Sequence, residues 1–257
     1  MSQTTFSQYI ALGDSMSIDL YAALDAGLTD VSVALERIEA SGKVAPVGAA
    51  SLFYQNDESL WPEEIGNDLL SRFPKMAFRR LAVDGATLGD VFGEQLPLID
   101  ESDEPTLVTL TIGSEDLFSA FSGAPKRTLL DQIVGDLIEA YDLLLGAIQT
   151  TLPNSLIVAT TVCDPSDRTG RIKGVLDDMS PLPIRALDRF NIHIREEVST
   201  MRGVAFADPY VHFLGHGQTA PEEDRWFWRR SPIELNSRGA NELRKVWVET
   251  LRGVMGG

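Results

Sequence analysis

Short apolar runs alternate with longer amphipathic segments along almost the whole sequence. Five apolar runs have the length of strands, at residues 9–12, 76–82, 107–112, 156–161 and 204–208. The stretches between them have helical spacing, at residues 61–73, 87–96, 126–152, 184–201 and 237–251. Helices that cross between buried strands are typical of a sheet covered on both faces. The pattern predicts an α/β fold of three layers, α/β/α, around a doubly wound, mostly parallel five-stranded sheet.

Three long insertions interrupt this alternation, at about residues 17–60, 163–183 and 210–235. The first contains a helical patch at residues 31–40. All three leave from the carboxyl ends of strands, where open parallel sheets bind ligands, so we expect them to supply the walls of a binding site. No repeat or linker divides the sequence, and we predict a single domain over residues 1–257.

Composition restricts the possible partners. Lys and Arg number 22 against 38 Asp and Glu, which gives a formal net charge of −16. This charge disfavours nucleic acid and anionic lipid surfaces, and no apolar run has the length needed for membrane insertion. Cys163 is the one cysteine and there are three histidines, so neither a disulfide nor a zinc cluster is expected. The first residues lack the pattern of a signal peptide, and we expect a cytoplasmic protein.

A turn of small residues, Gly13-Asp14-Ser15, follows the first predicted strand and ends in a hydroxyl group. A serine at the carboxyl end of a strand can point into the binding crevice, while nearby backbone N–H groups face an oxyanion. The turn therefore suits a nucleophile. The alternative is an ordinary turn or helix N-cap, in which the same residue types are common.

Three more segments accompany this turn in a fixed order. Together the four are Gly13-Asp14-Ser15-Met16, Asp84-Gly85-Ala86-Thr87, Thr111-Ile112-Gly113-Ser114-Glu115-Asp116 and Ile233-Glu234-Leu235-Asn236. In these blocks the chain resembles the SGNH (GDSL) hydrolase superfamily. The resemblance implies an esterase-like or lipase-like serine hydrolase that cleaves a small-molecule carboxylic ester without a cofactor or metal. It also implies that Ser15 is the nucleophile and that the N–H groups of Ser15 and Gly85 form part of the oxyanion hole.

Two blocks depart from the family pattern. The third block normally carries an asparagine that donates to the oxyanion, and Glu115 stands at that position. An ionised carboxylate cannot donate, so either Glu115 is protonated or another group replaces it. The last block normally carries an Asp and a His, and Ser231 and Glu234 stand there instead. The general base therefore has to be another residue, or the domain has lost its catalysis.

Two residues are candidates for the missing base. His216 lies after the fifth strand between two glycines, and Asp208 at the end of that strand could orient its ring. His212 lies nearby in a more apolar run, and we prefer His216. Glu234 is the other candidate, because a carboxylate with a raised pKa could accept the serine proton. His193 falls within a predicted helix, which favours a structural role.

Asp14 and Trp226 are the expected substrate-binding residues, Trp226 as part of an aromatic stretch that could cover an acyl group or pack on the core. Two rival functions remain open. One is a binding or regulatory module that keeps the fold without catalysis. The other is a flavodoxin-like flavin or nucleotide binder, which the acidic first turn disfavours because it offers a phosphate few open amides. The sequence makes no prediction of the oligomeric state.

Overall fold

The structure is a computed structural model that describes residues 5–29, 44–122, 127–175 and 181–256. The helical patch expected at residues 31–40 lies outside the described residues.

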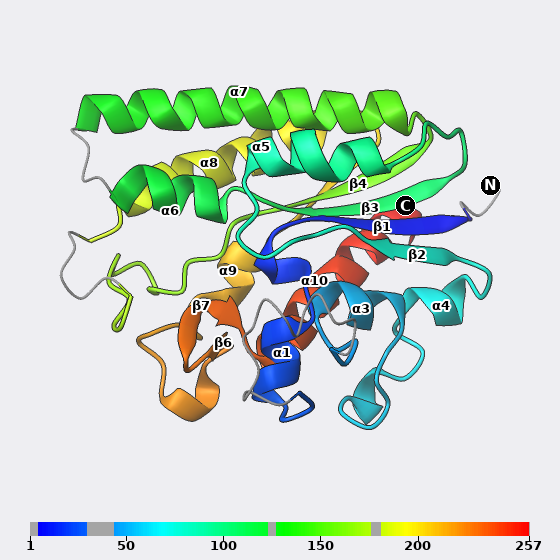
Figure 1. The fold of residues 1–257 in the computed structure, drawn as a ribbon, viewed down its shortest axis with the longest axis horizontal. Helices are drawn as coiled ribbons and strands as arrows, with labels where there is room; N and C mark the ends of the chain where they lie inside the picture. Colours follow the sequence, from blue (N-terminus) through cyan, green and yellow to red (C-terminus); the bar gives the residue numbers. More distant parts are fainter. Residues whose placement is uncertain (1–4, 30–43, 123–126, 176–180, 257) are drawn as a thin grey trace.

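A five-stranded parallel sheet forms the centre of the molecule (Figure 1). The strand order is β2-β1-β3-β4-β5, and every neighbouring pair is parallel. All five strands lie where the apolar runs predicted them: β1 (Gln8–Gly13), β2 (Ala77–Arg80), β3 (Thr106–Thr111), β4 (Ser155–Thr160) and β5 (Val204–Ala207). The predicted α/β fold with a doubly wound sheet is confirmed.

Helices cover both faces of the sheet. One layer contains α5 (Leu88–Asp90), α6 (Ser114–Ser122), α7 (Arg127–Thr151) and α8 (Ile184–Glu196). The opposite layer contains α1 (Leu20–Asp25), α3 (Ala49–Tyr54), α4 (Leu69–Arg72), α9 (Pro209–Phe213) and α10 (Ser237–Gly256). Single turns of helix occur at Ser15–Ser17, Pro62–Glu64, Val91–Gln95, Leu96–Leu98, Val198–Thr200 and Glu222–Asp224. None of the described helices is long and apolar enough to cross a membrane.

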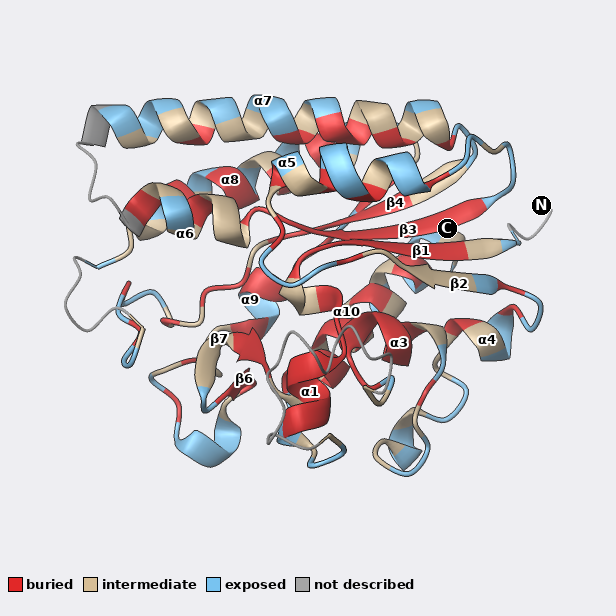
Figure 2. Cartoon of the chain, in the orientation of Figure 1, coloured by how far each residue is buried: buried red, intermediate tan, exposed pale blue. Residues whose placement is uncertain are grey.

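The two faces of the sheet belong to separate hydrophobic cores, and β1 illustrates why. Side chains alternate along a strand, so Ile10 and Leu12 enter the core beneath α7 and α8. Tyr9 and Ala11 enter the core beneath α3 and α10. Figure 2 shows the central strands buried along nearly their whole length. The sheet is therefore a rigid base whose carboxyl edge can position reacting groups.

One predicted helix is wrong. Residues 61–73 form a single turn at Pro62–Glu64 and then the short helix α4. The chain leaves the first turn at Ile65 and starts again at Asp68, whose side chain accepts a hydrogen bond from Ser71 N at 2.7 Å. An N-cap inside the amphipathic stretch restarts the helix, because its side chain competes for the backbone donors.

The insertions contain more regular structure than the sequence predicted. The first carries α1 and α3, and the third carries α9 and an antiparallel hairpin of β6 (Phe227–Trp228) and β7 (Ser231–Leu235). In Figure 1 this hairpin lies beside α1 and below α9. It delivers Glu234 to the carboxyl edge of the sheet. That the whole chain is one domain stays a prediction.

Candidate active site

The serine turn is fixed by backbone contacts at the end of β1. Gly13 has a φ of +120°, and a Cβ there would lie 1.8 Å from the Thr111 carbonyl oxygen of β3. Asp14 N donates to the same carbonyl oxygen at 2.8 Å. The chain then enters the single turn at Ser15–Ser17, where the Asp14 side chain accepts from Met16 N at 3.1 Å. Only glycine allows the backbone at position 13 to approach β3 so closely. The turn places Ser15 at the edge of the sheet, where it is half-buried.

Gln95 stabilises the same turn, a role that nothing in the sequence indicates. Its side chain is buried and bonds both polar groups of Gly13: Oε1 accepts from Gly13 N at 2.9 Å, and Nε2 donates to Gly13 O at 2.8 Å. The single turn at Val91–Gln95 aims this side chain at β1. A glutamine in an amphipathic segment looks like a surface residue, so only the three-dimensional structure identifies it.

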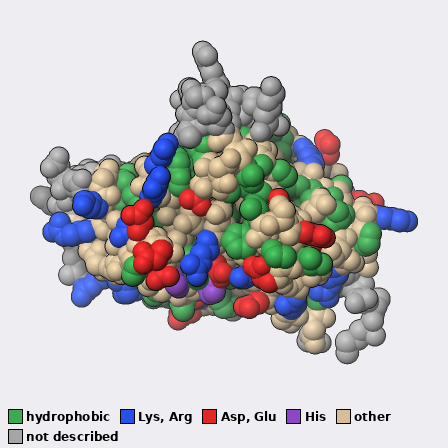
Figure 3. Space-filling view, turned by 90° about the horizontal axis from the view of Figure 1, so that it is seen from below, with side chains coloured by type: hydrophobic (Ala, Val, Ile, Leu, Met, Phe, Trp, Pro, Cys, Tyr) green, Lys and Arg blue, Asp and Glu red, His purple; other side chains and the backbone are tan. Residues whose placement is uncertain are grey.

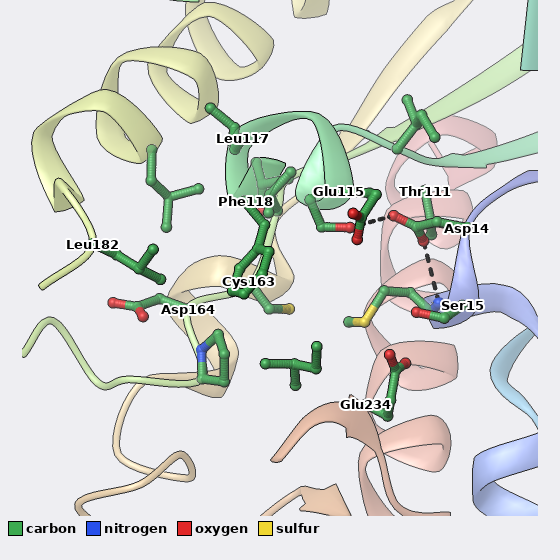
Figure 4. A pocket seen from close by; sticks show the side chains of 18 of the residues that line it. Asp14, Ser15, Thr111, Glu115, Leu117, Phe118, Cys163, Asp164, Leu182 and Glu234 are labelled. Atoms are coloured by element: carbon green, nitrogen blue, oxygen red, sulfur yellow. Dashed lines mark hydrogen bonds between the residues drawn. The ribbon is translucent and has the colours of Figure 1, made fainter. Parts of the chain in front are cut away.

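Asp14 lies beneath the serine and is almost fully buried. Burial raises the pKa of its carboxyl group to about 6, against the opposing effect of hydrogen bonds from Ser114 and Met16. Ser114 Oγ donates to Asp14 Oδ2 at 2.6 Å and so joins the start of α6 to the serine turn (Figure 4). Asp14 also lines the pocket. Its oxygens are engaged by the protein, which indicates a positioning role.

Among the ionisable groups that line the pocket, Glu234 has the pKa best suited to accepting a proton. It is 8% exposed, and its carboxyl group and the Ser15 side chain point toward one another across the pocket (Figure 4). Burial raises the pKa of Glu234 to about 8, the Ser15 side chain opposes this by hydrogen bonding, and the charges of Asp84, Asp14 and Glu115 raise it further. Its Oε2 atom is buried without a hydrogen-bond partner among the described residues.

Gly85 and Glu115 lie on the same pocket wall as Ser15. Gly85 has a φ of +66°, a backbone conformation that favours glycine, and is exposed after β2. Glu115 is half-buried at the start of α6, where its Oε1 accepts a hydrogen bond from Ser119 Oγ at 3.0 Å. The structure therefore brings Ser15, Gly85, Glu115 and Glu234, one residue from each of the four sequence blocks, together around one pocket.

The expected pairing of His216 with Ser15 is not found. The His216 ring stacks on Trp226 with ring centroids 3.7 Å apart, and its Nδ1 lies 3.0 Å from the Asp224 carbonyl oxygen. Trp226 is itself buried by this packing, and neither ring is among the residues that line the pocket. The third insertion folds back on itself through these contacts. Its aromatic stretch therefore covers the core, the alternative that the sequence left open.

The other histidines also bind elsewhere. His212 Nε2 lies 2.9 Å from Glu242 Oε2, and His193 Nε2 lies 2.7 Å from Asp142 Oδ1. Figure 3 shows histidine side chains on the outer surface of the face seen from below, among acidic and basic side chains. No imidazole lines the Ser15 pocket in the described part of the chain.

Asp208 does not orient a histidine, because its carboxylate forms a salt bridge with Arg195. Arg195 donates to both of its carboxylate oxygens, from Nε at 2.7 Å and from Nη2 at 2.8 Å, and Thr161 Oγ1 donates at 2.9 Å. Burial opposes ionisation of Asp208, but these hydrogen bonds and the Arg195 charge outweigh it and lower its pKa. The group is a stable anion that joins α8 to the end of β5.

The rest of the pocket is mainly apolar. It extends from Ser15 between α6, α8 and the second insertion. Its apolar wall includes Leu117, Phe118, Val162, Ile172, Leu182 and Leu187. Within the described residues, no three His, Cys, Asp or Glu side chains are grouped so as to hold a metal ion. The arrangement combines a hydroxyl group, a buried carboxyl group and space for an apolar chain.

A parallel sheet that presents a serine turn and a glycine turn to one pocket defines a hydrolase-type α/β fold. The chain belongs to the GDSL-like lipase/acylhydrolase family, whose sequence model matches residues 9–231. A comparison with curated protein sequences finds no match.

Solved structures of lipases and esterases share this fold. The extracellular lipase of Streptomyces rimosus is 19% identical over 95% of this chain and 99% of that chain, with a TM-score of 0.56. Phospholipase A1 of Streptomyces albidoflavus is 18% identical over 96% and 100%, with a TM-score of 0.58. A lipolytic G-D-S-L family protein of Veillonella parvula is 12% identical over 94% and 96%, with a TM-score of 0.57. At these identities the similarity establishes the fold alone.

Proposed function

We propose that the protein is a serine ester hydrolase in which Ser15 is the nucleophile and Glu234 is the general base. One observation carries the proposal: a buried carboxyl group with a pKa of about 8 faces the hydroxyl group of Ser15, at the end of the Gly13-Asp14-Ser15 turn. A carboxylate with so high a pKa accepts a proton far better than an ordinary glutamate does.

The proposed reaction has two stages. Glu234 takes the proton of Ser15 Oγ as this oxygen attacks the ester carbonyl carbon, and the carbonyl oxygen becomes an oxyanion. The carbonyl then re-forms, the bond to the alcohol oxygen breaks, and Glu234 returns the proton to the leaving alcohol. In the second stage a water molecule, deprotonated by Glu234, attacks the acyl-serine ester. The second tetrahedral intermediate then breaks down: the bond between the acyl carbon and Ser15 Oγ breaks, Glu234 returns the proton to Ser15 Oγ, and the carboxylic acid is released.

The oxyanion would be stabilised by the backbone N–H groups of Ser15 and Gly85. Both residues line the pocket, and fixed backbone donors stabilise negative charge without needing to reorient during the reaction. Glu115 is not assigned a donor role, because a carboxylate only accepts hydrogen bonds, as its Oε1 does from Ser119 Oγ. A site with two donors instead of three implies a modest turnover number.

The apolar wall suits the acyl part of the ester. A hydrocarbon chain that enters between α6 and α8 removes apolar surface from water, which is favourable at about 25 cal/mol for each Å² buried. The carboxyl groups of Asp14, Glu115 and Glu234 lie around the reacting end. The inner pocket would therefore accept an uncharged acyl chain and exclude an anionic one.

A binding module without catalysis is the second candidate. It is favoured by one observation: within the described residues no imidazole lines the pocket, although the family pattern places a histidine in the last block.

Labelling with a fluorophosphonate probe and hydrolysis of a p-nitrophenyl ester distinguish the two candidates. We expect wild-type protein and Ser7→Ala, which alters an exposed serine, to be labelled and active. Ser15→Ala is expected to lose both labelling and hydrolysis. Unlabelled, inactive wild-type protein would establish the binding module, and labelling that persists in Ser15→Ala would exclude Ser15 as the nucleophile.

A further inference from the structure

A second hollow adjoins the Ser15 pocket. It lies between the second insertion and the β6–β7 hairpin and is lined by Lys173, Gln218, Arg225, Trp228, Arg229 and Pro232, together with Gly174 and Phe227. We call this hollow the basic groove. The proposed mechanism makes no use of its side chains.

The basic groove and the Ser15 pocket share a wall. Phe227 lines both of them. In the second insertion, Ile172 lines the pocket and the next residue, Lys173, lines the groove. In the hairpin, Ile233 lines the pocket and the preceding residue, Pro232, lines the groove. The two hollows are therefore adjacent, and Phe227 is the residue that a ligand reaching from Ser15 into the groove would have to pass.

The charge of the groove is opposite to that of the molecule. The chain carries a net charge of −16, yet three cations and no carboxylate line this hollow. Neither Lys173, Arg225 nor Arg229 forms an ion pair with a described residue. Cations gathered without counter-ions in an acidic protein attract an anion to that position.

Arg225 is held ready to bind such an anion. Its Nε donates to Ala220 O at 2.9 Å and its Nη2 donates to Gln218 O at 3.1 Å, while Nη1 has no hydrogen-bond partner among the described residues. The loop that supplies these carbonyl groups is itself tied down. Asp167 accepts from Thr219 Oγ1 at 2.6 Å, and Gln218 N donates to Pro165 O at 2.8 Å. The guanidinium group is thus positioned before a ligand arrives.

We propose that the basic groove binds a phosphate group on the alcohol part of the ester substrate. The proposal rests on the proposed function and names its substrate class: an uncharged acyl chain joined through an ester to an alcohol that bears a phosphate. The acyl chain occupies the apolar pocket, the ester carbonyl lies at Ser15, and the alcohol leads past Phe227 to Lys173, Arg225 and Arg229. Guanidinium and ammonium groups are strong donors to phosphate oxygens. The carboxyl groups near Ser15 reject the phosphate, which fixes the direction in which the substrate binds.

Two esters with the same acyl chain test this directly: octanoyl glycerol and octanoyl glycerol phosphate. The test variant is Lys173→Gln combined with Arg229→Gln. The matched control is Arg230→Gln, which alters the exposed neighbour that does not line the groove. We expect the ratio of kcat/KM for the phosphate ester to that for the neutral ester to fall about tenfold in the double variant, because charge-assisted hydrogen bonds are lost. In the control the ratio should stay as in wild type. An unchanged ratio in the double variant would overturn the proposal.

Binding without turnover separates this proposal from the proposed function. Ser15→Ala protein is titrated by calorimetry with octyl glycerol phosphate, an ether that cannot be hydrolysed, and with inorganic phosphate. We expect the ether to bind, its Kd to rise about tenfold when Lys173 and Arg229 are also replaced, and inorganic phosphate to bind more weakly. If neither ester is hydrolysed but the ether binds in this way, the proposed function is wrong, while the proposal that the basic groove binds a phosphate group is supported. Absent binding of the ether, or equal binding of inorganic phosphate, would overturn the substrate assignment.

Discussion

At the residue scale, Glu115 is the feature of the pocket that most opposes ester hydrolysis. It lines the pocket with Ser15 and Gly85, so its carboxylate charge lies near the place where an oxyanion would form. An ionised carboxylate has no proton to donate and repels a second negative charge. The residue therefore explains why a complete serine turn need not give rapid turnover.

Replacing Glu115 with asparagine is expected to increase turnover. Glu115→Asn removes the charge and supplies an amide N–H donor, and one such donor is worth about 10²–10³ in kcat in a well-studied protease. Because the shorter side chain has not been optimised for this pocket, we expect a gain of about tenfold or more in kcat for a p-nitrophenyl ester.

Glu94→Asn is the control for this change, because it removes an exposed glutamate that does not line the pocket. Its kcat should stay within about twofold of wild type. A loss of turnover in Glu115→Asn would mean that the carboxyl group of Glu115 takes part in the reaction as a proton donor or acceptor.

At the scale of elements, the single turn at Val91–Gln95 determines where β1 ends. Gln95 bonds both backbone polar groups of buried Gly13, two residues before Ser15. A buried polar group that loses its partner costs about 1–3 kcal/mol. The contact therefore connects the stability of the fold to the position of Ser15, the proposed nucleophile.

Gln95→Met tests this connection, since methionine keeps the volume and removes both hydrogen bonds. Gly13 O keeps a hydrogen bond from Val83 N, so only Gly13 N loses its partner. We expect the free energy of unfolding, measured in urea, to fall by about 1–3 kcal/mol, together with a lower kcat. Gln132→Met, at an exposed position of α7, should change the free energy of unfolding by no more than about 0.5 kcal/mol. Equal stability of the two variants would show that the Gly13 contacts are dispensable.

The inner strands β1, β3 and β4 could be predicted from sequence because they are mostly buried on both faces and read as mainly apolar runs, whereas the edge strand β2 is only partly buried. Every residue of β3, for example, is buried. The segment at 61–73 misled the prediction because its apolar spacing continues across Ile65 and Asp68, where local caps interrupt the helix. The spacing of apolar residues indicates which side chains face the core. It does not reveal an interruption of the helix that is only a few residues long.

The site was predictable only in part, for a different reason. The serine and glycine turns are local motifs, and the structure brings them to one pocket as expected. The proton acceptor depends on contacts between distant segments. His216 lies between two glycines, which favoured an accessible ring, but in the structure its ring stacks on Trp226. Glu234 reaches Ser15 because a hairpin that the sequence did not predict carries it there.

At the scale of the whole molecule, burying Glu234 links activity to stability. The folded state raises its pKa from 4.5 to about 8, so folding favours the protonated form. The stabilising contribution of this proton is complete below about pH 4.5, and it is lost as the pH rises through about 8. The protein is therefore less stable with Glu234 ionised, the form that the proposed mechanism requires.

Glu234→Gln should remove this pH dependence. We expect wild type and variant to have similar free energies of unfolding near pH 5, and the variant to be more stable by roughly 2–4 kcal/mol near pH 9, because a neutral amide need not ionise while buried. Urea unfolding at the two pH values measures the difference. Parallel behaviour of the two proteins would contradict the raised pKa.

The most direct test of the central claim, that Glu234 deprotonates Ser15, is the pH dependence of the rate at which a fluorophosphonate labels the protein. The account predicts that the second-order rate constant rises with pH and levels off above about pH 8, where Glu234 is ionised. In Glu234→Gln the rate should fall by about 10²-fold or more and lose this inflection. An inflection near pH 6.5, the ordinary pKa of an imidazole, or one that survives in Glu234→Gln, would contradict the account.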